Sequence, residues 1–194
     1  MKQEILQRHA LDQGTDLPEF TVPRDYIRSV TIHDQLSTAG IFDALWLSYP
    51  VRSAYATLHN YRVGKAGESG TMFLRRQLEE NAHFISFYVL SGQEIALGTD
   101  ISKWAVLLNV GKEFYSPTEI TAVDLPVEYQ HFFGKKFSSF KTPYLVRFDA
   151  KGAGAKFILN ADVKQLELVF RSSGKEGKLT WSINKEDRAY SGGQ

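Results

Sequence analysis

The sequence predicts an α+β fold, in which a helical hairpin near the N-terminus precedes an antiparallel β-sandwich, with an immunoglobulin-like arrangement as one option. Two segments between about residues 50 and 82 repeat apolar residues at three- and four-residue spacing. From about residue 83 to 183, short alternating runs follow one another without another clear helical pattern. Strands grouped in this way favour antiparallel sheets over a parallel α/β sheet.

The helical hairpin is predicted from apolar spacing and from helix breakers. Pro50 suits the first turn of a helix, and the three glycines of "VGKAGESGT", residues 63–71, interrupt the pattern. A second helix is predicted for "TMFLRRQLEEN", residues 71–81. The side chains expected to face inward are Val51, Ala54, Tyr55 and Leu58 in the first helix, and Phe73, Leu74 and Leu78 in the second.

The predicted strands are short runs bounded by turn-forming or charged residues. A hairpin around "SSGKEGK", residues 172–178, gives the clearest pattern, because apolar residues alternate on both of its sides. Its arms pair Leu166, Leu168 and Phe170 with Leu179, Trp181 and Ile183. Strands are expected at residues 27–33, 83–90, 103–110, 118–125, 144–148, 156–160, 165–171 and 177–183, and the run 41–50 is expected to be extended and to lead into the first helix.

Length and composition indicate one domain and exclude some chemistry. The chain of 194 residues is expected to hold a polar arm or tether (1–24), a single domain (25–183) and a polar tail (184–194), with the helical portion at about 50–82 and the β-rich portion at about 83–183. The net charge of +1 argues against a global attraction to nucleic acid. Because there is no cysteine, disulfides, thiolate nucleophiles and thiolate metal sites are excluded. No cofactor is predicted.

One segment carries a spacing that is known from metal sites. In "LRRQLEENAHFISFYVL", residues 74–90, Glu80 precedes His83 by three positions and Glu79 lies beside it. A metal-dependent hydrolase that uses these residues with another histidine is therefore one hypothesis. The preferred interpretation is an ordinary helix end, because Arg75 and Arg76 stand four residues before the glutamates and can pair with them.

A second candidate segment mixes aromatic and basic residues. It is "EYQHFFGKKFSSFKTPY", residues 128–144, and its candidate ligand-binding residues are Tyr129, His131, Phe132, Phe133, Lys135 and Lys136. Aromatic rings beside lysines suit a single-stranded nucleic-acid platform or a lipid interface, which makes this another hypothesis for the function. The preferred interpretation is that several rings pack beneath a long loop and that the lysines face solvent.

The order of these features resembles a family of uncharacterised predicted bacterial lipoproteins. The resemblance covers roughly residues 35–183 and rests on "FDALWLSYPVRSAY", "KWAVLLNVGKEFYSPTEI", "HFF", "TPYLVRFD" and "LELVFRSSGKEGKLTW". It implies a cell-envelope or periplasmic location, in which the polar first residues follow a lipid-modified cysteine that a preceding leader supplies. A native Met1 would instead imply a cytoplasmic protein. The family implies no activity and no catalytic residues.

These observations together predict a non-enzymatic binding or structural module, tethered in a bacterial cell envelope, whose partner is a protein or a small ligand. Nucleic acid is an unfavoured partner, and a membrane is expected to be contacted only through the lipid tether. The metal-dependent hydrolase and the nucleic-acid or lipid-binding domain are the two alternatives.

Overall fold

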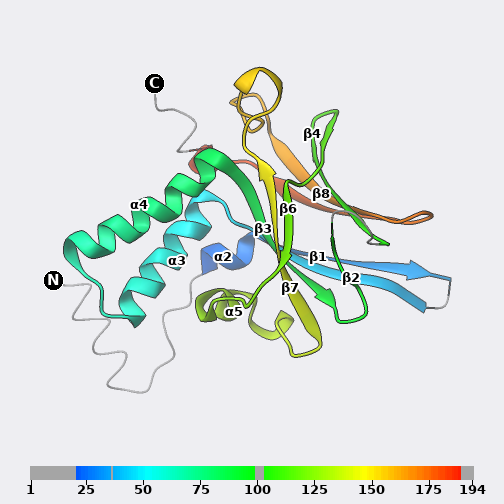
Figure 1. Ribbon diagram of the computed structural model, residues 1–194, viewed down its shortest axis with the longest axis horizontal. Coiled ribbons are helices and arrows are strands. Elements are labelled where there is room, and N and C mark those ends of the chain that lie inside the picture. Colours follow the sequence, from blue (N-terminus) through cyan, green and yellow to red (C-terminus); the bar gives the residue numbers. More distant parts are fainter. Residues whose placement is uncertain (1–20, 36, 99–102, 189–194) are drawn as a thin grey trace.

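The protein folds into two antiparallel sheets and a group of helices (Figure 1). The structure is a computed structural model and describes residues 21–35, 37–98 and 103–188. The helices are α2 (Thr21–Asp25), α3 (Tyr49–Arg62), α4 (Gly67–His83) and α5 (Val127–Phe133), with 3-10 turns η1 (Gly134–Lys136), η2 (Ala153–Ala155) and η3 (Glu186–Arg188). The strands are β1 (Ile27–Asp34), β2 (Ser37–Trp46), β3 (Phe84–Gly92), β4 (Ala105–Val110), β5 (Glu113–Tyr115), β6 (Glu119–Ala122), β7 (Lys141–Asp149), β8 (Gln165–Arg171) and β9 (Glu176–Ser182).

The two sheets confirm the predicted α+β sandwich. One sheet has the strand order β1-β2-β3-β7-β6 and the other has β5-β4-β8-β9, and all neighbouring strands are antiparallel. The predicted terminal hairpin is present, with Leu166 opposite Trp181 and Leu168 opposite Leu179. The strand order differs from the immunoglobulin arrangement, which places the first, second, fifth and fourth strands together.

Aromatic side chains fill the space between the two sheets. The ring of Phe42 on β2 stacks on Phe170 of β8 with centroids 4.1 Å apart, and Phe87 on β3 contacts Trp181 of β9 at 5.3 Å. All four rings are buried. Because large rings bury much apolar surface, this inner core holds the two sheets together.

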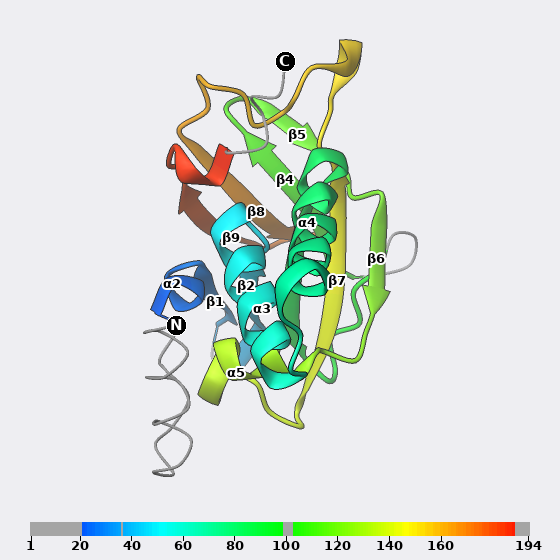
Figure 2. The same ribbon diagram turned by 90° about the vertical axis from the view of Figure 1, so that its left-hand side faces the viewer.

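A second core lies on the other face of the five-stranded sheet, where the helices pack (Figures 1 and 2). It contains Leu45 of β2, Leu90 of β3, Val51 and Leu58 of α3, and the rings of α5. The five-stranded sheet is therefore the middle of three layers. This explains why β3 carries large residues on both faces, as its sequence indicates.

Some predictions about individual segments were wrong. Residues 156–160 do not form a strand: the chain makes one isolated bridge there, between Lys151 and Phe157. The 3-10 turn η2, which contains Gly154 with a φ of +73°, reverses the chain just before residue 156, and the segment returns only far enough to form this one bridge. The helix α5 and the short strand β5 had no counterpart among the predicted elements.

The chain ends are only partly described. Residues 1–20 of the predicted arm (1–24) lie outside the described residues, and residues 21–24 belong to α2. Residues 189–194 of the predicted tail also lie outside them. The tail begins in contact with the fold, since Tyr26 donates a hydrogen bond to Asp187 at 2.6 Å. Each helix in the described part of the chain is too short or too polar to cross a bilayer.

Candidate functional site

A polar pocket lies where the helices meet the outer face of the five-stranded sheet. Figure 2 shows α3 and α4 side by side over this sheet, with α5 below them. The pocket has a volume of about 240 Å³. Its lining consists of Arg52 and Tyr55 from α3, Arg76, Gln77 and Glu80 from α4, Tyr88 from β3, Tyr129 from α5 and Arg147 from β7. We call it the arginine–tyrosine pocket.

The strand register places Arg147 in the floor of this pocket. It stands opposite Glu119 of β6, and its Nη1 donates to Glu119 Oε2 at 3.0 Å. Its Nη2 reaches Glu80 Oε2 at 3.4 Å, and its guanidinium lies 5.2 Å from the ring centre of Phe84. Arg147 is thus held by two carboxylates, although its buried Nε has no hydrogen-bond partner among the described residues.

Arg52 is the unusual residue of the pocket. Arg52 as a whole residue is only 5% exposed, and its Nε donates a hydrogen bond to Asn81 Oδ1 at 2.7 Å. Within the described ranges, its two terminal nitrogens have no hydrogen-bond acceptor and no carboxylate pairs with it. Burial lowers the pKa of Arg52, because desolvation penalises the charged form, but an arginine stays protonated in proteins. The pocket therefore contains a buried positive charge without a direct ion pair, although the nearby Glu80 carboxylate favours its charged form.

Three tyrosines form a wall beside Arg52. Tyr129 stacks on Tyr55 with ring centroids 4.4 Å apart and meets the ring of Tyr88 edge-on at 4.8 Å. Burial raises the pKa of all three phenols above the ordinary value. Their hydroxyl groups consequently stay protonated at neutral pH and can donate hydrogen bonds to a bound anion.

A buried carboxylate lies at the neighbouring end of α3. Glu128 of α5 is 2% exposed, and its Oε1 accepts a hydrogen bond from Arg62 Nε at 2.7 Å and lies 3.1 Å from His59 Nδ1. Burial alone would raise the pKa of Glu128, but the hydrogen bonds from Arg62, the backbone and His59 outweigh it and lower the pKa. The cluster fastens α5 to α3.

Glu128→Gln is expected to lower the free energy of unfolding at pH 7 by about 1.5–3 kcal/mol, the range for hydrogen bonds to a charged group. Because the folded pKa of Glu128 is depressed, its contribution is complete above the unfolded pKa and is lost as the pH falls through the folded pKa. The difference between the two proteins should therefore shrink below about pH 4.3. Urea unfolding across this pH range measures it, with the exposed Glu79→Gln as control. A difference that does not change with pH would contradict the assignment.

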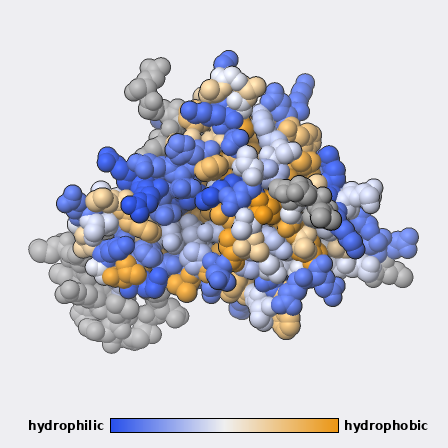
Figure 3. Space-filling view, viewed as in Figure 1, coloured by the Kyte–Doolittle hydropathy of each residue, from blue (hydrophilic) through white to orange (hydrophobic). Residues whose placement is uncertain are grey.

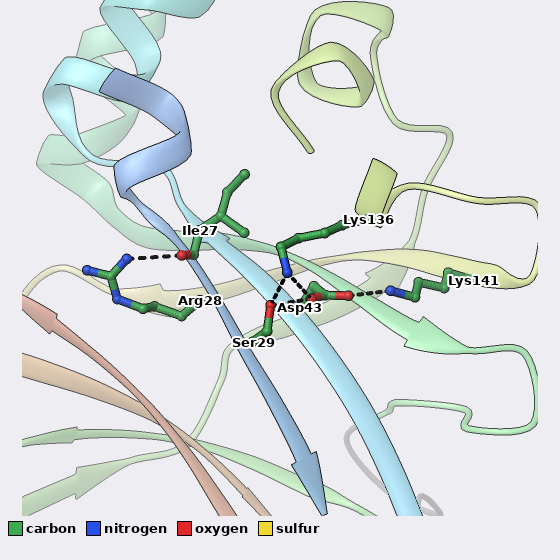
Figure 4. A network of polar contacts seen from close by, with 6 residues as sticks. All are labelled: Ile27, Arg28, Ser29, Asp43, Lys136 and Lys141. Atoms are coloured by element: carbon green, nitrogen blue, oxygen red, sulfur yellow. Dashed lines mark hydrogen bonds and ion pairs between the residues drawn. The ribbon is translucent and has the colours of Figure 1, made fainter. Parts of the chain in front are cut away.

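A second charged cluster ties the first two strands to the segment after α5 (Figure 4). Asp43 of β2 is 3% exposed; its Oδ1 accepts from Ser29 and, at 3.3 Å, from Lys136, and its Oδ2 accepts from Lys141. Lys136 Nζ also donates to Ser29 Oγ at 2.6 Å. The serine and lysine lie as close as in a catalytic pair, but both are bonded to Asp43, which makes the arrangement a network that joins β1, β2, η1 and β7.

The residues predicted in the aromatic and basic segment are separated by the structure. Tyr129, Phe132 and Phe133 are buried in the second core, whereas His131, Lys135 and Lys136 are exposed. Of these six residues, only Tyr129 lines the arginine–tyrosine pocket. Elsewhere in the segment, Phe140 is 76% exposed. Three of the rings therefore belong to the interior of the protein rather than to a surface for stacking bases.

The predicted metal candidates lie at the end of α4, and the structure does not gather them into a centre. Glu79 and His83 are exposed, and Glu80 pairs with Arg147 instead of the predicted Arg76. His83 is the last residue of α4 and β3 starts directly after it, as the change of pattern predicts. Within residues 21–35, 37–98 and 103–188, no three or more histidine, aspartate or glutamate side chains are arranged to hold a metal ion.

Sequence reasoning missed most of the pocket, although one signal was available. Arg52 precedes Tyr55 by three residues, so both lie on the helix face that the apolar spacing assigns to the interior. A charged residue on such a face either has a partner or marks a site. Arg147 gave no such signal, because its role depends on strand pairing that the sequence does not reveal.

Comparison of the chain with protein-family models, with curated proteins and with solved structures found no match.

Proposed function

We propose that this protein is a non-enzymatic binding module and that its arginine–tyrosine pocket receives the anionic group of a small ligand. The observation that carries this proposal is the buried guanidinium of Arg52, which has no carboxylate partner among the described residues. A buried charge without a partner costs several kcal/mol, so a fold that keeps one pays in stability. An anion that enters the pocket would recover much of this cost.

The chemistry of the lining supports the same proposal. Arg76 adds a second cation at the rim, and the tyrosine hydroxyls supply neutral donors. Guanidinium groups bind carboxylate, phosphate and sulfate through two parallel hydrogen bonds. Buried polar groups that converge in a concave site are what a small-ligand pocket requires.

Small anions are expected to stabilise the wild-type protein against thermal unfolding and to have no such effect on Arg52→Met. A ligand that binds only the folded state stabilises it by about 2.7 kcal/mol at a hundred times its Kd. The measurement is the unfolding midpoint in sodium acetate, phosphate and sulfate, with sodium chloride at equal ionic strength as reference.

Two adjacent arginines of α4 provide a matched control. Both Arg75 and Arg76 are exposed, but only Arg76 lines the pocket. Arg76→Met should weaken the anion effect, whereas Arg75→Met should leave it as in the wild type. If the anions shift wild type and Arg52→Met equally, the effect is a general salt effect and the proposed site is wrong.

We further propose that the module acts at a bacterial cell envelope. The resemblance of residues 35–183 to predicted lipoproteins supports this location. We expect the uncut reading frame to contain a leader that ends in a cysteine, and the protein expressed from it to incorporate radiolabelled palmitate. A native Met1 together with recovery from the cytoplasmic fraction would contradict the location and would leave the pocket unaffected.

A further inference from the structure

The charges around the arginine–tyrosine pocket add up to +1 when the rim residue Arg76 is counted. Three arginines line the pocket, and two carboxylates, Glu80 and Glu119, both bond Arg147. The net charge of these five groups is therefore +1. Arg76 lies at the exposed rim, and the charges of the other four groups cancel; among these four, Arg52 is the one without a direct ion pair in the described part of the chain.

A singly charged ligand matches this site better than a doubly charged one. A monoanion brings the net charge of the pocket with its five groups to zero, whereas a phosphate dianion brings it to −1 and places its second charge near the Glu80 carboxylate. The Glu80 carboxylate repels this second charge, and water screens part of the repulsion because the Glu80 side chain is 38% exposed. Glu80 therefore acts against dianions.

The bonding of Arg52 also suits a planar carboxylate. Its Nε is occupied by Asn81, which leaves the two terminal nitrogens available as a pair. Such a pair can bond both oxygens of one carboxylate in a plane. The hydroxyl groups of the lining tyrosines can satisfy the remaining lone pairs of the carboxylate.

The remainder of the pocket calls for a hydrophilic ligand body. A volume of about 240 Å³ exceeds what a lone carboxylate fills, and it would otherwise hold several water molecules. Gln77 and Glu80 provide acceptors for hydroxyl groups. An apolar body would displace water from Gln77 and from the Glu80 oxygen that Arg147 does not bond, and it would return no hydrogen bonds to them.

We propose that the ligand of the pocket is a small hydroxylated monocarboxylic acid, such as a sugar acid, and that the pocket discriminates against phosphate and sulfate dianions. This inference rests on the proposed function. Arg52 binds the carboxylate, and Glu80 sets the preference for one negative charge and accepts a hydrogen bond from a ligand hydroxyl group.

Three compounds with the same sugar ring test the inference by isothermal titration calorimetry near neutral pH. They are glucuronate with one charge, glucose 6-phosphate with nearly two, and glucose with none. Glucuronate is expected to bind about tenfold or more tightly than glucose 6-phosphate, because the second charge meets Glu80. Glucose should show no measurable binding, and Arg52→Met should lose the binding of glucuronate.

Glu80→Gln provides the second variant, since it raises the net charge of the five groups from +1 to +2. It is expected to improve the affinity for glucose 6-phosphate several-fold. The ratio of the glucuronate affinity to the glucose 6-phosphate affinity should therefore fall. Tighter binding of glucose 6-phosphate by the wild type, with dependence on Arg52, would overturn the inference but keep the proposed function. Absence of any Arg52-dependent binding, by these compounds and by the simple anions, would overturn both.

Discussion

Replacement of both Lys136 and Lys141 by methionine is expected to lower the free energy of unfolding by about 3–5 kcal/mol, because it leaves the buried Asp43 carboxylate without a cation. Ser29 would remain as the only side chain that donates to Asp43 among the described residues. One hydroxyl group cannot replace the hydration that a carboxylate loses when it is buried. Chemical denaturation at neutral pH measures the loss.

Two further variants separate charge from packing in this cluster. Asp43→Asn added to the double variant should recover part of the stability, because it removes the unpaired charge while keeping the shape of the side chain. Lys135→Met is the matched control, since Lys135 is an exposed neighbour, whereas the lysines bonded to Asp43 are Lys136 and Lys141. A loss below about 1 kcal/mol in the double variant, the size of a surface pair, would show that water reaches Asp43.

Arg52→Met is expected to change stability in the opposite direction. In the absence of ligand, the variant should be more stable than the wild type by about 1–4 kcal/mol, because an apolar side chain of similar length replaces a buried charge that has no direct ion pair among the described residues. Asn81 loses its bond to Arg52, but it is partly exposed and can bond to water instead. The two free energies of unfolding, compared in a chloride buffer, measure the gain.

A gain in stability combined with a loss of ligand binding is the pattern expected of a functional residue that is kept at a cost to the fold. Arg52→Lys serves as the comparison, because it retains the buried charge and removes the planar pair of donors. It should bind carboxylates weakly without the gain in stability. If Arg52→Met instead destabilised the protein by several kcal/mol, Arg52 would be a structural residue and the pocket would lose its main support.

Much of the fold followed from the sequence because its signals were local. Pro50 marked the start of α3, and alternation of apolar residues indicated the terminal hairpin. Of the three glycines in residues 63–71, only Gly64 lies between the helices, because α4 starts at Gly67, four residues before the predicted start, and includes Gly70. The helix α5 escaped prediction because it has only seven residues, too few to show a helical period, and several of them are aromatic. Residues 156–160 are a short apolar run bounded by polar residues, as in a strand, yet only the isolated bridge between Lys151 and Phe157 forms there.

The candidate site was less accessible to sequence reasoning, because its residues come from five separate elements. The sequence correctly predicts that Glu80 lies on a helix, but it predicts an ion pair between Glu80 and Arg76, four residues earlier on the same helix. The structure pairs it with Arg147, which is distant in the chain and is brought near by the packing of α4 on the sheet. Local spacing predicts partners on the same helix, whereas contacts between layers require knowledge of the topology.

The guanidinium NMR signal of Arg52 during a titration with glucuronate tests most directly whether the pocket is a ligand site. The signal can be assigned by its disappearance in Arg52→Met. If Arg52 binds the carboxylate, its Nε–H resonance should shift and saturate with the ligand concentration, while that of the exposed Arg75 stays in place. A resonance of Arg52 that does not move, or that moves only as much as the resonance of Arg75, would contradict the assignment of this pocket as the binding site.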